Sequence, residues 1–301
     1  METAVLGKLA GVALIAAIGA LGAWAGLLKR ETQDGLSKVL FYLVFPPLVF
    51  HRLVTQTTAE GILQLWTLPL VGFAGMVLGG LLGLAFLPLL KPERPLRGTF
   101  LHLMFTNNYL FLPLPILSAL APKYEPLLFI MTLGCNIAFW TIGIWILPGK
   151  PGERRFRIPP GTIALFLGIA ATFAGLGKVL PAFALDALGT LGSAGVPMIL
   201  LLIGAGLWGI PLRGHARLLS AFTVLRLGVY PLAAWGMISL FPLGTDARIV
   251  AFVVATMPSA LTSIVTIREY GGDADFAARA VLATTLLSAI TIPLWLALFL
   301  R

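Results

Sequence analysis

The residues with the clearest potential to bind a ligand lie around prolines inside apolar stretches of the sequence. The first group consists of Asn107 and Asn108, followed by Pro113 and Pro115. A proline inside a helix removes a backbone donor and clashes with the preceding turn. Amide side chains offer both hydrogen-bond donors and acceptors. This pattern predicts a broken helix with polar groups at the break.

A second group of the same kind begins at Met257 and Pro258 and continues with three hydroxyl side chains, Ser259, Thr262 and Ser263. If both stretches cross a membrane, their non-helical backbone must be buried in protein or line a water-filled cavity. Paired breaks in corresponding spans are a sequence indicator of a transporter binding site. The half-helix after each break begins with free N–H groups and a partial positive charge, which favours a carboxylate ligand.

Membrane-spanning helices are the elements that must position these groups. The chain has 301 residues, of which 58% are hydrophobic and 11% charged, and its mean hydropathy is +0.97. Soluble domains carry about 25% charged residues. Apolar stretches of about 20 residues, long enough to cross ~30 Å of hydrocarbon, recur from end to end. The net charge of +9 lies in short loops rather than on a face with interleaved aromatic residues, so nucleic acid is not expected as a partner.

Ten spans follow from the apolar windows and the breakers between them. The first is expected to stay in the chain, because its apolar run is longer than that of a signal peptide. Lys and Arg are concentrated in the loops after the odd-numbered spans, which predicts a multi-pass protein of the cell (inner) membrane with both termini outside. The spans lie near residues 5–28, 36–56, 61–88, 98–121, 125–147, 160–180, 187–208, 216–241, 246–268 and 275–300.

The two halves of the chain resemble each other at an offset of half its length. Thr141–Trp145 aligns with Thr291–Trp295, and Pro47 aligns with Pro197, although such matches also arise by chance in an apolar chain. Because five spans is an odd number, the second half enters the membrane from the opposite side, as in the inverted repeats of secondary transporters. We therefore predict an all-α integral membrane fold with ten transmembrane helices. Its parts are a first five-helix repeat at 1–148, a cytoplasmic linker at 149–159 and a second repeat at 160–301.

Ionisable residues narrow the mechanism. All twelve Asp and Glu residues lie in or beside loops, so coupling through a mid-membrane carboxylate is disfavoured. Arg226 is the charged residue placed deepest in a span, where it could balance an anionic substrate or lie against backbone carbonyls. His102 and His51 are expected near the membrane interface.

Simpler structural roles are open for the other candidate residues. Each proline could be a plain kink, and each asparagine could form an interhelical hydrogen bond worth about 1 kcal/mol. Thr262 and Ser263 could bond back to their own helix. Cys135 is the single cysteine and lies in an apolar stretch, so neither a disulfide nor a metal cluster is expected. An enzyme is not expected either, because the His-Glu-x-x-His motif is absent.

The sequence resembles the auxin efflux carrier family, which includes plant auxin exporters and bacterial carriers of malonate, malate and similar anions. Four stretches carry the resemblance, namely Phe41–Phe50, Asn108–Pro115, Gly195–Met198 with Gly204–Leu207, and Met257–Asp273. The resemblance implies a scaffold part and a transport part, broken spans four and nine that cross at the substrate site, and an elevator-like movement.

By the same resemblance, the family's asparagine falls on Asn108 and its crossover prolines fall on Pro115 and Pro258. Two positions depart from the family. Pro113 stands where a small residue is usual, and Thr262 stands where an asparagine is common.

The sequence thus predicts a secondary transporter of a small organic anion, a mono- or dicarboxylate that is auxin-like or malonate/malate-like, working by alternating access at a helix crossover. A passive channel, or a sensor with the same fold, is the alternative. The expected partners are the substrate and the lipid bilayer, with no cofactor, and a homodimer is left open. The residues expected to bind substrate are Asn107, Asn108, Pro113, Pro115, Met257, Pro258, Ser259, Thr262, Ser263 and Arg226.

Overall fold

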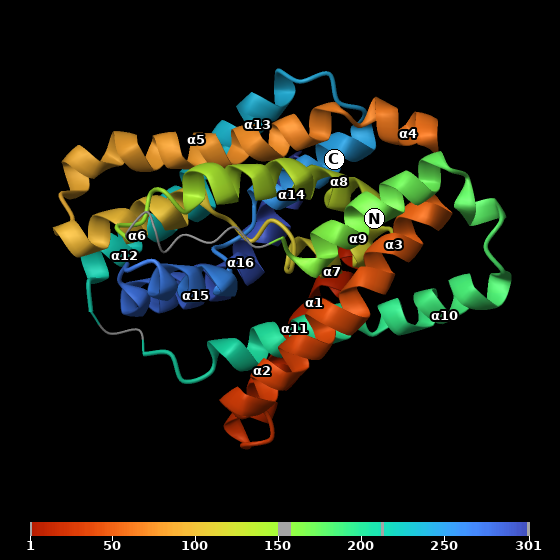
Figure 1. Ribbon diagram of the computed structural model, residues 1–301. Helices are drawn as coiled ribbons and strands as arrows, with labels where there is room; N and C mark the ends of the chain where they lie inside the picture. Colours follow the sequence, from red (N-terminus) through yellow and green to blue (C-terminus); the bar gives the residue numbers. More distant parts are fainter. Residues whose placement is uncertain (1, 150–157, 212–213, 300–301) are drawn as a thin grey trace. The chain divides into compact units, whose positions relative to one another are not determined.

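The computed structural model describes residues 2–149, 158–211 and 214–299, and every regular element in these ranges is a helix (Figure 1). Within them, seven helical segments are long and apolar enough to cross a membrane. The chain is therefore an all-α membrane protein. The seven segments are Gly7–Trp24, Arg30–Gln56, Ala59–Leu90, Tyr124–Gly143, Ala182–Leu207, Ala216–Ser239 and Ala274–Phe299.

The other three expected spans contain shorter helices. Residues 98–121 fall on α6 (Arg94–Phe105) and α7 (Pro113–Leu120), and residues 246–268 fall on α14 (Thr245–Ala255) and α15 (Leu261–Glu269). Both proline-containing stretches are thus interrupted where the sequence predicts a break. Residues 160–180 hold the apolar helix α9 (Pro160–Phe173) and a short 3-10 turn.

The helices pack into two compact units, and each unit combines segments from both halves of the sequence. Unit 1 takes the described parts of 1–66, 114–130 and 157–208, and unit 2 takes those of 67–113, 131–156 and 209–301. The sequence predicts a different division, into repeats at 1–148 and 160–301 that follow each other along the chain. These repeat boundaries stay a prediction.

Unit 1 relies on small residues for close helix contacts. Helix α1 packs along α11, and an added Cβ at Gly19 or Gly204 would overlap the backbone of the facing helix. Such small-residue contacts are typical of helices packed in lipid. The unit contains α1 (Glu2–Trp24), α2 (Arg30–Val39), the π-helical turn η1 (Leu40–Val44), α3 (Phe45–Gln56), α4 (Ala59–Gln64), α9, α10 (Ala182–Ser193) and α11 (Gly195–Leu207).

Unit 2 is built on the glycine-rich helix α5 (Thr67–Leu90), which packs against α6, α13 and α14. Gly72, Gly75, Gly79 and Gly83 recur every three or four residues along one face, and this face contacts α6, Tyr230 and the second part of α8. The other elements of the unit are η2 (Phe139–Gly143), α12 (Ala216–Val224), η5 (Leu225–Val229), α13 (Tyr230–Ser239), α14, α15 and α16 (Ala274–Phe299), while α8 spans Tyr124–Ala138.

His102, expected near the membrane interface, is buried inside unit 2, and its depth in the membrane stays a prediction. Helix α6 begins at Arg94, four residues before the predicted span, so His102 lies about 12 Å along the helix at 1.5 Å per residue. Its side chain is fully buried, and Nδ1 lies 2.8 Å from the carbonyl oxygen of Gly143. Because a carbonyl only accepts, Nδ1 carries the proton.

Candidate functional site

The breaks in the two proline-containing segments meet in unit 2. The backbone N–H of Asn108 donates to the carbonyl of Pro258 at 2.8 Å. The side-chain nitrogen Nδ2 of Asn107 donates to the carbonyl of Val254, in the last turn of α14, at 2.7 Å. Each break thus supplies partners for polar groups of the other, which a buried interruption of a membrane helix requires.

The side chain of Asn108 stabilises the break that precedes α7. Its Oδ1 accepts hydrogen bonds from the backbone N–H groups of Phe111 at 3.1 Å and Leu112 at 3.2 Å. This use of an asparagine oxygen on free N–H groups resembles helix N-capping. The oxygen is therefore committed to the backbone, and the amide nitrogen is the side-chain donor that is left for a ligand.

Arg226 joins both breaks from the π-helical turn η5. Its Nη1 donates to the carbonyl of Met104 at 3.0 Å, and its Nε donates to the carbonyl of Met257 at 3.3 Å. The guanidinium carbon lies 4.3 Å from the ring centroid of Tyr230, in cation-π geometry. The side chain is fully buried, and Nη2 has no hydrogen-bond partner. Of the two roles open from the sequence, the structure shows the contact with carbonyls.

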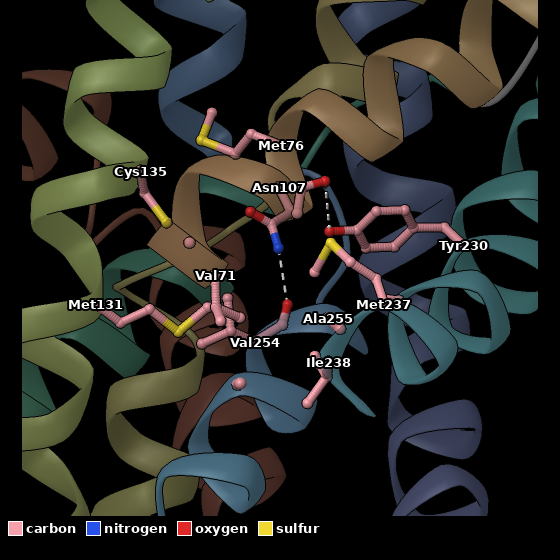
Figure 2. Close-up of a pocket in the computed structure, with 14 residues that line it drawn as sticks. Val71, Met76, Asn107, Met131, Cys135, Tyr230, Met237, Ile238, Val254 and Ala255 are labelled. Atoms are coloured by element: carbon pink, nitrogen blue, oxygen red, sulfur yellow. Dashed lines mark hydrogen bonds between the residues drawn. The ribbon is translucent and has the colours of Figure 1, made fainter. Parts of the chain in front are cut away.

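A narrow pocket lies beside this crossing, between α5, α8, α13 and α14 (Figure 2). It contains about 270 Å³ of space free of atoms, open solvent included. Its lining is mostly apolar, and Asn107 and Tyr230 are its polar side chains other than the thiol of Cys135.

Figure 2 shows the carboxamide of Asn107 inside the pocket, with its nitrogen toward Val254 and its oxygen on the side of Cys135. The oxygen is buried without a partner, so the pocket offers one unused acceptor.

The remaining candidate residues are distributed unevenly. Pro113 is the first residue of α7 and Pro115 lies in its first turn, and both are buried. Ser259 and Ser263 are buried with hydroxyl groups that have no partner among the described residues, so neither bonds back to its helix. Thr262 is exposed. Thr262 is not part of the hydrogen bonds at the crossing. The residues that the crossing brings together are Asn107, Asn108, Met257, Pro258 and Arg226.

Two residues with buried polar contacts, one in each unit, were not predicted from the sequence. Tyr230 stacks on Arg226 and donates to the carbonyl of Gly75 at 3.1 Å. Its position four residues after Arg226 on a helix was the available signal. Glu125, in the first turn of α8, is 1% exposed and pairs with Nε of Arg52 in unit 1 at 2.8 Å. Over the described ranges, His, Cys, Asp and Glu form no cluster of three that could hold a metal ion.

Comparison with known proteins gives a family. The sequence matches the family described as membrane transport protein over residues 4–157 and 154–296. It is 26% identical to an uncharacterized transporter of Methanocaldococcus jannaschii, over 94% of this chain and 95% of the other. It is 25% identical to an uncharacterized transporter of Methanothermobacter thermautotrophicus, over 90% of each chain. A shorter match of 30% identity covers 37% of this chain and 29% of the protein PIN-LIKES 3 of Arabidopsis thaliana.

Proposed function

The chain belongs to the membrane transport protein family, to which the auxin efflux carriers and the PIN-LIKES proteins belong, and we propose that it is a secondary transporter of a small organic anion. The substrate class is a mono- or dicarboxylate. It is carried by alternating access at the helix crossover. The observation that supports this proposal is the pair of hydrogen bonds that joins the two breaks, from Asn108 to Pro258 and from Asn107 to Val254.

In this proposal the donors left over at the crossing receive the carboxylate. Nδ2 of Asn108 is one of them, because its oxygen is bound to Phe111 and Leu112. The hydroxyl of Ser259 is a second, since it is buried beside Pro258 without a partner. Helix α15 begins at Leu261, directly after this break, and its first N–H groups add partial positive charge. A hydrogen bond to a charged group contributes about 1.5–3 kcal/mol.

We also propose the membrane topology expected from the sequence, with ten crossings, two inverted repeats, residence in the cell membrane and both termini outside. The composition of the two units supports the repeat. Expected spans one and two fall in unit 1 together with spans six and seven, and expected span three falls in unit 2 together with span eight. Three pairs of corresponding spans thus enter the same unit, whereas spans four and five are divided between the units and spans nine and ten lie in unit 2.

The proposed function is tested by uptake into liposomes that contain the purified protein. A panel of labelled mono- and dicarboxylates is offered under pH, sodium and voltage gradients in turn, and empty liposomes are the control. We expect saturable uptake of at least one carboxylate. Unlabelled substrate on the other side of the membrane should accelerate this uptake. Uptake no greater than in empty liposomes for every compound and gradient would reject the proposal. Single-channel currents would instead identify a pore.

The topology is tested with single cysteines in a Cys135→Ala background, labelled in intact cells with a membrane-impermeant maleimide. Cysteines placed at Thr3 and Arg301, at the two ends of the chain, are expected to react without permeabilisation. Cysteines in the loop that contains Lys91 are expected to react only after permeabilisation. The reverse pattern would contradict the proposed orientation.

A further inference from the structure

The charge of Arg226 is the most unusual feature of unit 2. A guanidinium with no exposed surface lies inside a candidate membrane span, and no ion pair of Arg226 is found among the residues that the structure describes. A charge in the membrane interior is costly and is expected to face protein groups that compensate it. The question is which groups of this protein carry the compensating negative charge.

Arg226 binds the carboxyl-terminal end of one half-helix and the unwound backbone just beyond another. Met104 lies in the last turn of α6, which ends at Phe105, and Met257 lies two residues after α14 ends at Ala255. The last carbonyls of a helix have no partner within it and carry a partial charge of about −0.5. The carbonyls of Met104 and Met257, at and just beyond two such ends, present partial negative charge to the guanidinium.

This arrangement has the form of a cation site. In transporters with discontinuous helices, unwound backbone carbonyls and the carboxyl-terminal ends of half-helices coordinate the coupling sodium ion. Here Met104 supplies a helix-end carbonyl and Met257 supplies an unwound one, and both are occupied by a side chain of the same protein. Tyr230 covers one face of the guanidinium and is itself bonded to Gly75 of α5, so the side chain is held in place.

We propose that Arg226 is a built-in cation that takes the place of a coupling metal ion at the crossing. The protein then needs no sodium ion to neutralise its half-helix ends. Without this side chain, the same carbonyls form an empty site for a small monovalent cation. Arg226 is accordingly a positioning residue that fixes the two breaks, while the substrate carboxylate is received by other groups. The cation role of Arg226 does not depend on the proposed function, whereas the expectation that transport needs no sodium ion does.

Thermal unfolding of the detergent-purified full chain tests the site without any transport measurement. We expect Arg226→Ala to lower the apparent Tm by about 5 °C or more, since about 1 kcal/mol corresponds to about 2–4 °C in a chain of this size class. Guanidinium chloride at about 20 mM should recover at least half of that loss by binding the folded state. Tetramethylammonium chloride at the same concentration, which cannot donate hydrogen bonds, should recover none.

Met104→Ala is the matched control, because it removes a fully buried side chain while the Met104 carbonyl and Arg226 remain. This variant and the wild type should show no stabilisation by guanidinium. An equal effect of guanidinium and tetramethylammonium on Arg226→Ala, or no loss of Tm in that variant, would overturn the proposal. Sodium chloride is the third salt, and a rise in the Tm of Arg226→Ala with Na⁺ alone would equally support a vacated cation site.

Arg226→Lys and Arg226→Gln keep the test decisive if the alanine variant does not fold. Lysine retains the charge with a different shape, whereas glutamine retains hydrogen-bond donors without the charge. The lysine variant should be the more stable of the two, and a glutamine variant of equal or greater stability would overturn the proposal. In liposomes, wild-type uptake should be unchanged when choline replaces Na⁺. A sodium requirement there would overturn the inference, whereas an absence of any uptake bears on the proposed function alone.

Discussion

Substitution of Asn108 separates its structural role from its proposed role in binding. The alanine variant removes the oxygen that accepts from Phe111 and Leu112, and the loss of such a cap typically costs about 1 kcal/mol. The aspartate variant is almost isosteric and keeps an acceptor oxygen in the same place. Its negative charge also lies before the amino-terminal end of α7, which is worth about 0.3–1 kcal/mol at exposed sites. Asn108 is only 6% exposed, however, and burying a carboxylate without a counter-charge is costly. We therefore expect the Tm of both variants to lie below that of the wild type.

The affinity for a carboxylate should distinguish the two variants from each other. Alanine loses one donor to a charged group, which is worth about 1.5–3 kcal/mol or roughly a tenfold to hundredfold loss of affinity. Aspartate loses the same donor and adds a like charge, and two unit charges at about 4 Å repel by about 4 kcal/mol at an effective dielectric constant of 20. Affinity should therefore decrease in the order Asn, Ala, Asp.

Stability and affinity are measured on the same purified samples. Thermal unfolding without ligand gives the stabilities, and isothermal titration with a carboxylate that the wild type binds gives the affinities. An aspartate variant that binds the carboxylate as tightly as the wild type would refute the assignment of Nδ2 as a ligand donor. An alanine variant as stable as the wild type would refute the assignment of Oδ1 as a cap.

Three further predictions concern other contacts. Gly79→Ala should destabilise unit 2 by about 2 kcal/mol or more, because its Cβ would meet the Met104 carbonyl that Arg226 binds. The control is Gly35→Ala, on an exposed helix with open space around it. It should stabilise the chain by about 0.4–1 kcal/mol in the same unfolding assay. Arg52→Ala should cost about 3 kcal/mol because it strands Glu125, which is 1% exposed, whereas Glu125→Ala should cost less because Arg52 is 26% exposed. Asn107→Leu should change the unfolding free energy by less than about 1 kcal/mol, because the Val254 carbonyl still accepts from the backbone N–H of Met257 and the substitution removes the unpaired Oδ1.

The breaks could be located from the sequence, whereas their partners could not. Proline acts on its own helix, so Pro113 and Pro258 mark interruptions through local sterics alone. The bond from Asn107 to Val254 joins residues far apart in the chain, and no local pattern specifies such a pairing. The contact of His102 with the carbonyl of Gly143 is likewise long-range, because the two residues lie 41 positions apart. The interleaving of both halves in each unit also depends on long-range packing.

The polar contacts at the crossing constrain any movement that carries a substrate. Asn108 with Pro258, Asn107 with Val254, and Arg226 with two carbonyls make four bonds between groups that are largely or fully buried. Separating the two breaks would break three of these four bonds, because Arg226 can keep one of its two carbonyls. A buried polar group that loses its partner costs about 1–3 kcal/mol, so the separation would cost about 3–9 kcal/mol. That is comparable to the entire stability of a typical domain. Under the proposed transport cycle, the two breaks must therefore move together, and the change of access must come from displacement of the crossing as a whole rather than from its opening.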